Sequence, residues 1–68
     1  MEADYKKLWV LLIERNLSKA QLRKMANLSS ATLTKLNKNE FVSMDVLAKI
    51  CDALDCNIGD IADLVKSI

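Results

Sequence analysis

The chain has 68 residues, a length that provides one small domain over residues 1–68. It contains no proline and one glycine, and this shortage of turn-forming residues argues against an all-β fold. Apolar residues make up 51 % of the chain, yet no segment reaches the roughly 20 apolar residues that span a bilayer. We therefore expect a cytoplasmic, all-α protein that makes no membrane contact.

The net charge of +1 conceals an uneven distribution along the chain. Residues 1–38 hold eight lysines and arginines against three acidic residues, a net charge of +5. Residues 39–68 hold two against six, a net charge of −4. A basic half favours a polyanionic partner, and ordinary solvated charge is the alternative interpretation.

Catalytic and metal-binding chemistry have little support in the sequence. There is no histidine, no phosphate-binding glycine loop and no acid–base pair, so we expect neither an enzyme nor a cofactor. Cys51 and Cys56 could form a disulfide in principle, but two reduced thiols are the favoured interpretation, with Cys51 packing as a small apolar residue. The spacing of Asp55, Asp60 and Asp63 is interpreted as a solvated face and not as a metal site.

The first helix is predicted to begin at Asp4, whose side chain can cap it, and to run to about Asn16. Its core positions recur at helical spacing: Tyr5, Leu8, Leu11 and Leu12. Three further apolar residues, Trp9, Val10 and Ile13, exceed what an amphipathic helix needs to bury. We expect them to face another helix or a partner, and ligand binding is the alternative.

The second helix is predicted to begin after Ser18, because Ser18 and Gln21 have the spacing of a capping box. Its inner face carries Leu22, Met25 and Ala26. These three apolar residues are expected to lie in the core.

The third helix is predicted to follow a tight turn. Asn27 stands where the chain must reverse, since asparagine tolerates the left-handed conformation, and Leu28 is expected to enter the core. Ser29 is the predicted cap of this helix, and Leu33 and Leu36 are predicted to face inward.

Two more helices are predicted in the second half. Residues 38–42 form a loop with Phe41 or Val42 beneath it, and Ser43 caps a fourth helix whose core positions are Leu47, Ile50, Cys51 and Leu54, with Met44 as core filler. Asn57 and Asp60 are predicted to cap a fifth helix with apolar positions at Ile58, Ile61, Leu64, Val65 and Ile68. The predicted fold is therefore all-α with five helices.

The segment from Ser18 to Asn37 has the form of a helix-turn-helix. A major groove about 12 Å wide accepts one α-helix, while the preceding helix crosses the DNA backbone. Side chains able to contact base edges or a thymine methyl point outward from the third helix: Ser30, Ala31, Thr34 and Lys35. Candidate phosphate contacts lie at the helix starts, in the following loop and on the basic rim: Lys19, Ser29, Thr32, Lys38 and Arg23.

Residues 5–68 resemble the Cro/C1-type (XRE-like) helix-turn-helix domains of phage repressors and small bacterial regulators. The resemblance is carried by Leu17-Ser18 with Leu22, by Asn27-Leu28-Ser29, by Thr32-Leu33 with Leu36, and by the segment 46–61. It implies a five-helix, lambda-repressor-like fold and a sequence-specific regulator, in particular a repressor, whose third helix reads double-stranded DNA.

The resemblance also implies roles by position. The family's base-reading positions fall on Ser30, Ala31, Thr34 and Lys35, and its phosphate contacts fall on Ser29, Thr32 and Lys38. The first residue of the second helix, often a glutamine on a phosphate, is Lys19 here. Where many members have a turn glycine, this chain has Asn27 and Asn39, and a small residue of the second helix is replaced by Arg23. The frequent Arg–Glu pair is replaced by Leu12 and Asn37, where we expect an apolar contact.

The expected partners are double-stranded DNA and a second copy of the chain, with no small-molecule effector. The predicted dimer interface lies on the first and fifth helices: Trp9, Val10, Ile13, Ile61, Val65 and Ile68. Two alternatives remain open. The fold could serve as a protein-interaction module, such as an antitoxin or accessory subunit, or it could bind phosphates without sequence preference.

Overall fold

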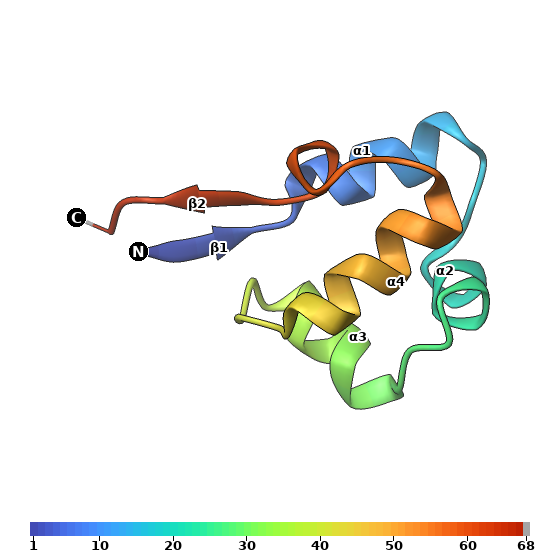
Figure 1. The fold of residues 1–68 in the computed structure, drawn as a ribbon, viewed down its shortest axis with the longest axis horizontal. Coiled ribbons are helices and arrows are strands. Elements are labelled where there is room, and N and C mark those ends of the chain that lie inside the picture. Colours follow the sequence, from blue (N-terminus) through green and yellow to red (C-terminus); the bar gives the residue numbers. More distant parts are fainter. Residues whose placement is uncertain (68) are drawn as a thin grey trace.

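The computed structural model describes residues 1–67, which form four α-helices, one 3₁₀ turn and two short strands (Figure 1). In chain order they are β1 (Glu2–Asp4), α1 (Lys6–Glu14), α2 (Lys19–Met25), α3 (Ser30–Asn37), α4 (Met44–Leu54), the turn η1 (Ile58–Asp60) and β2 (Asp63–Val65). The two strands pair antiparallel with Ala3 opposite Leu64, and they extend from one end of the helical body (Figure 1). No helix within residues 1–67 is long and apolar enough to cross a membrane.

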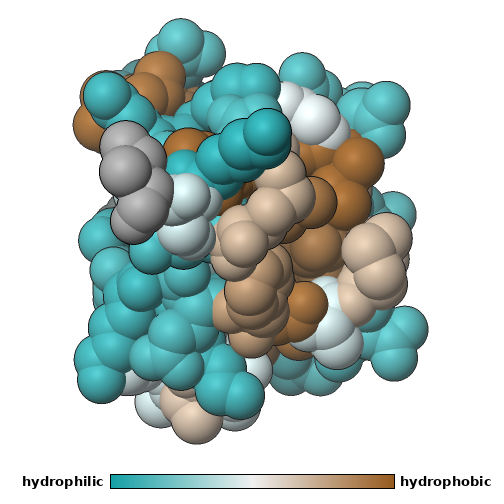
Figure 2. Space-filling view, turned by 90° about the vertical axis from the view of Figure 1, so that its left-hand side faces the viewer, coloured by the Kyte–Doolittle hydropathy of each residue, from teal (hydrophilic) through white to brown (hydrophobic). Residues whose placement is uncertain are grey.

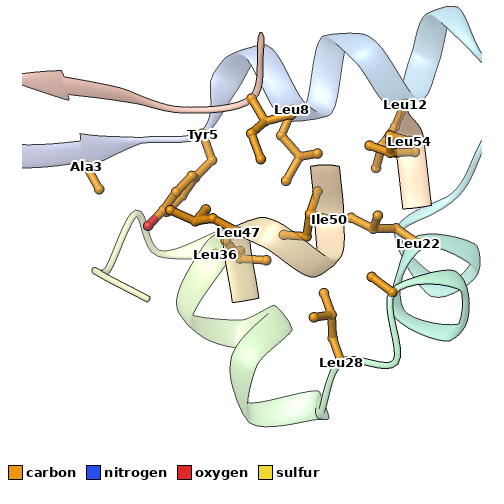
Figure 3. Packing of buried hydrophobic residues seen from close by; sticks show 12 residues of the cluster. Ala3, Tyr5, Leu8, Leu12, Leu22, Leu28, Leu36, Leu47, Ile50 and Leu54 are labelled. Carbon is orange, nitrogen blue, oxygen red and sulfur yellow. The ribbon is translucent and has the colours of Figure 1, made fainter. Parts of the chain in front are cut away.

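The core is built around α4, which crosses the middle of the molecule (Figure 1). Its buried side chains Leu47, Ile50 and Leu54 meet buried leucines from the other helices (Figure 3). Those leucines are Leu8 and Leu12 of α1, Leu22 of α2, Leu28 of the turn and Leu36 of α3. The predicted helical periodicity of the first four helices is therefore confirmed, with Leu11, Leu33 and Cys51 half-buried at the margins.

The predicted fifth helix is wrong. Its capping box is present, since the Asn57 N–H donates to the Asp60 carboxylate at 2.9 Å, but it opens only a single 3₁₀ turn. Ile61 then enters the core, and residues 63–65 become β2. The backbone of β2 finds its hydrogen-bond partners in β1 from the other end of the chain, a long-range pairing that local periodicity cannot reveal. Ile68 lies outside the described residues.

Three other predicted positions differ at the margins of the core. Met25 and Met44 are not core residues, because their side chains are 49 % and 67 % exposed. Met25 is the last residue of α2, where the chain turns away, and Leu22 and Ala26 fill the inner face without it. Asp4 lies in β1, although its carboxylate does accept the Lys6 N–H at 2.9 Å, next to the start of α1. In the loop, Val42 packs on the core while Phe41 stays exposed.

The four α-helices of residues 1–67 end in the same backbone turn. After each helix, a residue within two positions of the helix end has a left-handed φ: 57° at Asn16, 53° at Asn27, 56° at Asn39 and 50° at Asp55. The next N–H donates to the carbonyl five residues earlier, in the pairs Leu17–Leu12, Leu28–Arg23, Glu40–Lys35 and Cys56–Cys51. This is the Schellman motif, which usually has glycine at the left-handed position. Asparagine and aspartate adopt that conformation at the least cost among other residues, so a chain with one glycine can still reverse four times.

The left-handed conformation at Asn27 gives a stability prediction. Asn27→Ala should lower the free energy of unfolding by about 1 kcal/mol, because alanine lacks the side chain that tolerates positive φ. Asn27→Gly should keep the wild-type value or exceed it slightly. Urea denaturation followed by circular dichroism measures both, with Asp52→Ala inside α4 as the control. Equal stability of the alanine and glycine variants would contradict this account.

Tyr5 ties the start of α1 to the loop that follows α3. Its side chain is buried, and its hydroxyl donates to the Glu40 carbonyl at 2.7 Å. Its N–H donates to the Asn39 side-chain oxygen at 3.2 Å. Burial raises the pKa of Tyr5, and a backbone hydrogen bond from Val42 lowers it in part. Because the folded state favours the neutral phenol, this contribution to stability is complete below the unfolded pKa of about 10 and is lost as the pH rises through the folded pKa.

The raised pKa of Tyr5 predicts an alkaline loss of stability. The free energy of unfolding should fall above about pH 10 as the buried phenol ionises. Tyr5→Phe should be less stable at neutral pH by about 1–2 kcal/mol, because the Glu40 carbonyl loses its donor, and should show a shallower alkaline decline. Urea denaturation at a series of pH values measures the difference between the two proteins. Parallel curves for both proteins above pH 10 would rule out this role for Tyr5.

Candidate nucleic-acid interface

The pair α2 and α3 is fixed by side-chain caps at both helix starts. Ser18 and Gln21 form the predicted capping box: the Gln21 N–H donates to the Ser18 hydroxyl at 3.1 Å, and the Ser18 N–H donates to the Gln21 side chain at 2.7 Å. At α3 the Thr32 N–H donates to the Ser29 hydroxyl at 3.1 Å. Between the helices, Leu28 points from the turn into the core (Figure 3). The turn and both caps are confirmed, and together they set the direction of α3.

The four predicted base-reading residues share the exposed face of α3. Ser30, Ala31, Thr34 and Lys35 are all exposed and occupy the helix from its first residue to its last turn. The Thr34 hydroxyl donates to the Ser30 carbonyl at 3.0 Å, so its lone pairs stay open to an outside donor. Lys35 is the one long side chain of this set. The face can therefore approach a flat, polar surface closely, with one cationic probe.

The predicted phosphate contacts surround this face but differ in their freedom. Lys38 is exposed at the end of α3, and Arg23 is half-buried on α2. The Ser29 hydroxyl, which accepts the Thr32 N–H, also donates to the Thr32 hydroxyl at 2.9 Å. Ser29 and Thr32 are therefore engaged with each other as a cap, and an outside ligand would meet them as a preformed pair.

Lys19 is held at the junction of three helices, an arrangement that was not predicted from the sequence. Its ammonium donates to the Asn37 side-chain oxygen at 2.7 Å and lies 4.2 Å from the centre of the Trp9 ring. Trp9 belongs to α1, Lys19 begins α2 and Asn37 ends α3. The expected apolar contact between Leu12 and Asn37 is replaced: Leu12 is buried in the core, and exposed Asn37 contacts Lys19 instead. The sequence offered only a weak indication of this contact: a single tryptophan, and two polar residues placed at predicted helix ends.

The uneven charge of the sequence has two structural uses. The Lys7 ammonium pairs with the Asp63 carboxylate at 3.1 Å, the only ion pair among residues 1–67, and also donates to the Gly59 carbonyl. The Arg15 guanidinium donates to the Leu54 carbonyl, at the end of α4 where a cation is favoured. These two cations face the acidic half of the chain. Those on α2, α3 and the following loop form no ion pair with residues 1–67: Lys19, Arg23, Lys24, Lys35 and Lys38.

The residues of the predicted dimer interface differ in their exposure. Ile61 is fully buried and cannot contact a partner, and Trp9 is half-buried beside Lys19. Val10 and Ile13 are exposed on α1, Val65 is exposed on β2, and Ile68 lies outside the described residues. A different apolar surface is found at the end that carries the strands (Figure 2). It surrounds a hollow of about 460 Å³ whose exposed lining includes Phe41, Met44, Ile58 and Leu64.

The described residues contain no metal-ligand cluster of three or more His, Cys, Asp or Glu. Cys51 and Cys56 are free and half-buried. Burial, and then the neighbouring Cys51, raise the pKa of the Cys56 thiol, while Arg15 lowers it in part. The net effect keeps this thiol protonated at neutral pH.

Comparisons with known proteins agree with this arrangement. A model of the Cro/C1-type HTH DNA-binding domain matches residues 7–67. A solved structure described as the transcriptional regulator VanUg, Form II, superposes with a TM-score of 0.94 at 44 % sequence identity, covering 97 % of this chain and 88 % of that one. No curated protein matches the chain. The family match extends from α1 through β2 and includes the whole helix-turn-helix, so this chain belongs to the Cro/C1-type helix-turn-helix DNA-binding domain family.

Proposed function

We propose that this protein binds double-stranded DNA in a sequence-specific manner through α3 and acts as a transcriptional regulator, as a repressor of the genes beside its site. One observation carries the proposal: Ser30, Ala31, Thr34 and Lys35 form an exposed row on a helix whose direction is fixed by caps at both helix starts. The family match and the likeness to a transcriptional regulator support it.

Each residue of the row has a role that follows from its chemistry. Lys35 can donate to guanine O6 and N7, while Ser30 and Thr34 can exchange hydrogen bonds with several bases. Ala31 can contact a thymine methyl. Because three of the four side chains are short, α3 must lie close to the base edges. Lys19, Lys38 and Arg23 would then meet the phosphates on either side, with Ser29 and Thr32 at the start of the helix.

The protein is proposed to act as a homodimer. α3 has eight residues and is about 12 Å long, so one copy reads only a few base pairs and binds a single half-site weakly. Two copies related by a two-fold axis would read half-sites about 34 Å apart, one turn of DNA. The sum of the two copies' base contacts then gives the specificity that one copy lacks.

The apolar end beside the strands is the proposed contact between copies. Phe41 and Leu64 are 61 % and 65 % exposed, and Met44 is more exposed still. Together these three side chains expose apolar surface on the order of 300 Å² around one hollow. Each partner of a stable interface buries roughly 800 Å², so this patch would supply a sizeable part of such an interface. In a two-fold dimer the same patch meets itself, so an apolar patch is its own complement. The longest dimension of the molecule is 34 Å, and α3 lies between its two ends (Figure 1). A two-fold axis through the apolar end would therefore place the two copies of α3 less than twice 34 Å apart. That range includes the length of one DNA turn.

The same apolar end is the observation that favours the alternative, a protein-interaction module whose partner is another protein. The two functions differ in their dependence on salt. DNA binding releases counterions and weakens steeply as salt rises, whereas contact with an apolar surface does not.

The roles of Lys35 and Lys19 can be separated by DNA binding. Wild-type protein should select a defined sequence from random DNA and bind it with a clear negative salt slope. Lys35→Ala should relax the preference at one base position and cost about 1–3 kcal/mol at the selected site. Lys19→Ala should weaken all sequences alike and reduce the salt slope by about one. Lys49→Gln on α4 is the control. No binding at low salt would refute the proposed function and favour the interaction module, and an unchanged preference in Lys35→Ala would refute the assignment of reading residues.

If the protein is a homodimer, light scattering should give a mass of about 15 kDa, against 7.6 kDa for one chain. Leu64→Glu should shift the equilibrium toward the single chain, because two carboxylates would meet in an apolar contact. Ile13→Glu makes the same change on α1, at a side chain that is 74 % exposed, and should leave the dimer intact. A monomer both free and on DNA would exclude the dimer, and dissociation by Ile13→Glu alone would move the contact to α1.

A further inference from the structure

The contacts of Lys19 join three helices at one edge of the proposed DNA-binding surface. We define the Lys19 cluster as Trp9, Lys19 and Asn37. The ammonium donates to Asn37 at 2.7 Å and lies 4.2 Å from the Trp9 ring centre, inside the range of a cation–π contact. Trp9 is half-buried, so the ring is itself fixed by the core, whereas Lys19 and Asn37 are exposed. The cluster is thus an exposed cation held by one half-buried aromatic ring and one polar side chain.

Holding the Lys19 side chain in this way reduces the conformational entropy that it loses on binding a ligand. A free lysine side chain loses much conformational freedom when it binds a phosphate, and this loss reduces affinity. In the Lys19 cluster that freedom is already restricted before any ligand arrives. An ammonium has three N–H donors, and Asn37 accepts one of them while the Trp9 ring faces the cation without accepting a conventional hydrogen bond. Donor capacity therefore remains for an anionic oxygen.

The position of Asn37 adds a second effect. It is the last residue of α3, and through Lys19 it links the end of the reading helix to the start of α2. The cation that meets the DNA backbone and the helix that meets the bases are therefore held in a fixed relation. A phosphate contact made by Lys19 would set the register of α3 in the groove.

We propose that Trp9 and Asn37 are positioning residues that hold the Lys19 ammonium ready for a phosphate of the DNA backbone. This inference rests on the proposed DNA-binding function. Neither residue needs to touch the DNA. Both act by lowering the cost of ordering Lys19, so their loss weakens affinity without removing the charge itself.

The inference predicts a distinctive pattern in DNA titrations. Trp9→Leu and Asn37→Ala should each weaken binding about 3- to 10-fold at every salt concentration. Both should leave the salt slope unchanged, because Lys19 still reaches the phosphate. Lys19→Gln should instead lower the slope by about one. Trp9→Phe keeps an aromatic ring beside the ammonium and should restore most of the affinity.

A double-mutant cycle separates positioning from a general structural effect. In the Lys19→Gln background, Trp9→Leu and Asn37→Ala should cause no further loss of affinity, since there is no ammonium left to hold. Losses that add fully to that of Lys19→Gln would overturn the inference, as would unchanged affinity in both single variants. Circular dichroism of each variant confirms that the compared proteins are folded.

A measurement on the free protein distinguishes failure of this inference from failure of the proposed function. The side-chain protons of Lys19 next to the ammonium should show an upfield ring-current shift in NMR spectra, which Trp9→Leu abolishes and Lys49→Gln leaves in place. If the shift is present and wild-type protein binds no DNA at any salt concentration, the proposed function fails and this inference fails with it. If wild-type protein binds DNA and the shift is absent, the inference alone is overturned.

Discussion

The helices of this protein can pack on α4 because the chain reverses direction within two residues of each helix end. Each reversal uses one residue of left-handed conformation and a hydrogen bond from the following N–H back into the last helical turn. That bond satisfies a carbonyl that a helix end would otherwise leave open, and it fixes the angle at which the next segment departs. The placement of Leu17, Leu28 and Cys56 against the core follows directly, since each is the residue after a reversal.

The same device sets up the surface of α3. At Asn27 the reversal places Leu28 in the core and Ser29 at the cap position, so α3 begins only three residues after the reversal, at Ser30. At the other end of α3, Asn39 has a second use, because its side chain accepts the N–H of Tyr5. Tyr5 also holds the Glu40 carbonyl, and so the loop beyond α3 is tied to the start of α1. α3 is therefore anchored at both ends by local hydrogen bonds and buried contacts.

Features encoded over a few residues could be predicted from the sequence, and features that depend on distant partners could not. The helix caps and the tight turn depend only on residues that are close in sequence, and they are present as predicted. They are the capping box of Ser18 and Gln21, the cap at Ser29 and the left-handed Asn27. The segment after Asn57 carries a correct local signal for a helix start, but pairing with β1 decides its later residues. The Lys19 cluster was missed for the same reason: its three residues come from three helices, and only the packed fold brings them together. The exposed row on α3 was predictable because helical periodicity assigns it once the buried face is known. Its role toward DNA stays a prediction.

The pairing of β1 with β2 links residues near opposite ends of the described chain. Closing so large a loop costs on the order of 4 kcal/mol in chain entropy, more than a three-residue ribbon of exposed β2 side chains recovers by itself. The ribbon is therefore stable only where α1, α4 and η1 are docked and hold the two segments together. The same pairing places Leu64 at the hollow that it shares with Phe41 and Met44. The apolar end thus depends on the packing of the whole domain, and a change that loosens α1 or α4 would also remove this surface.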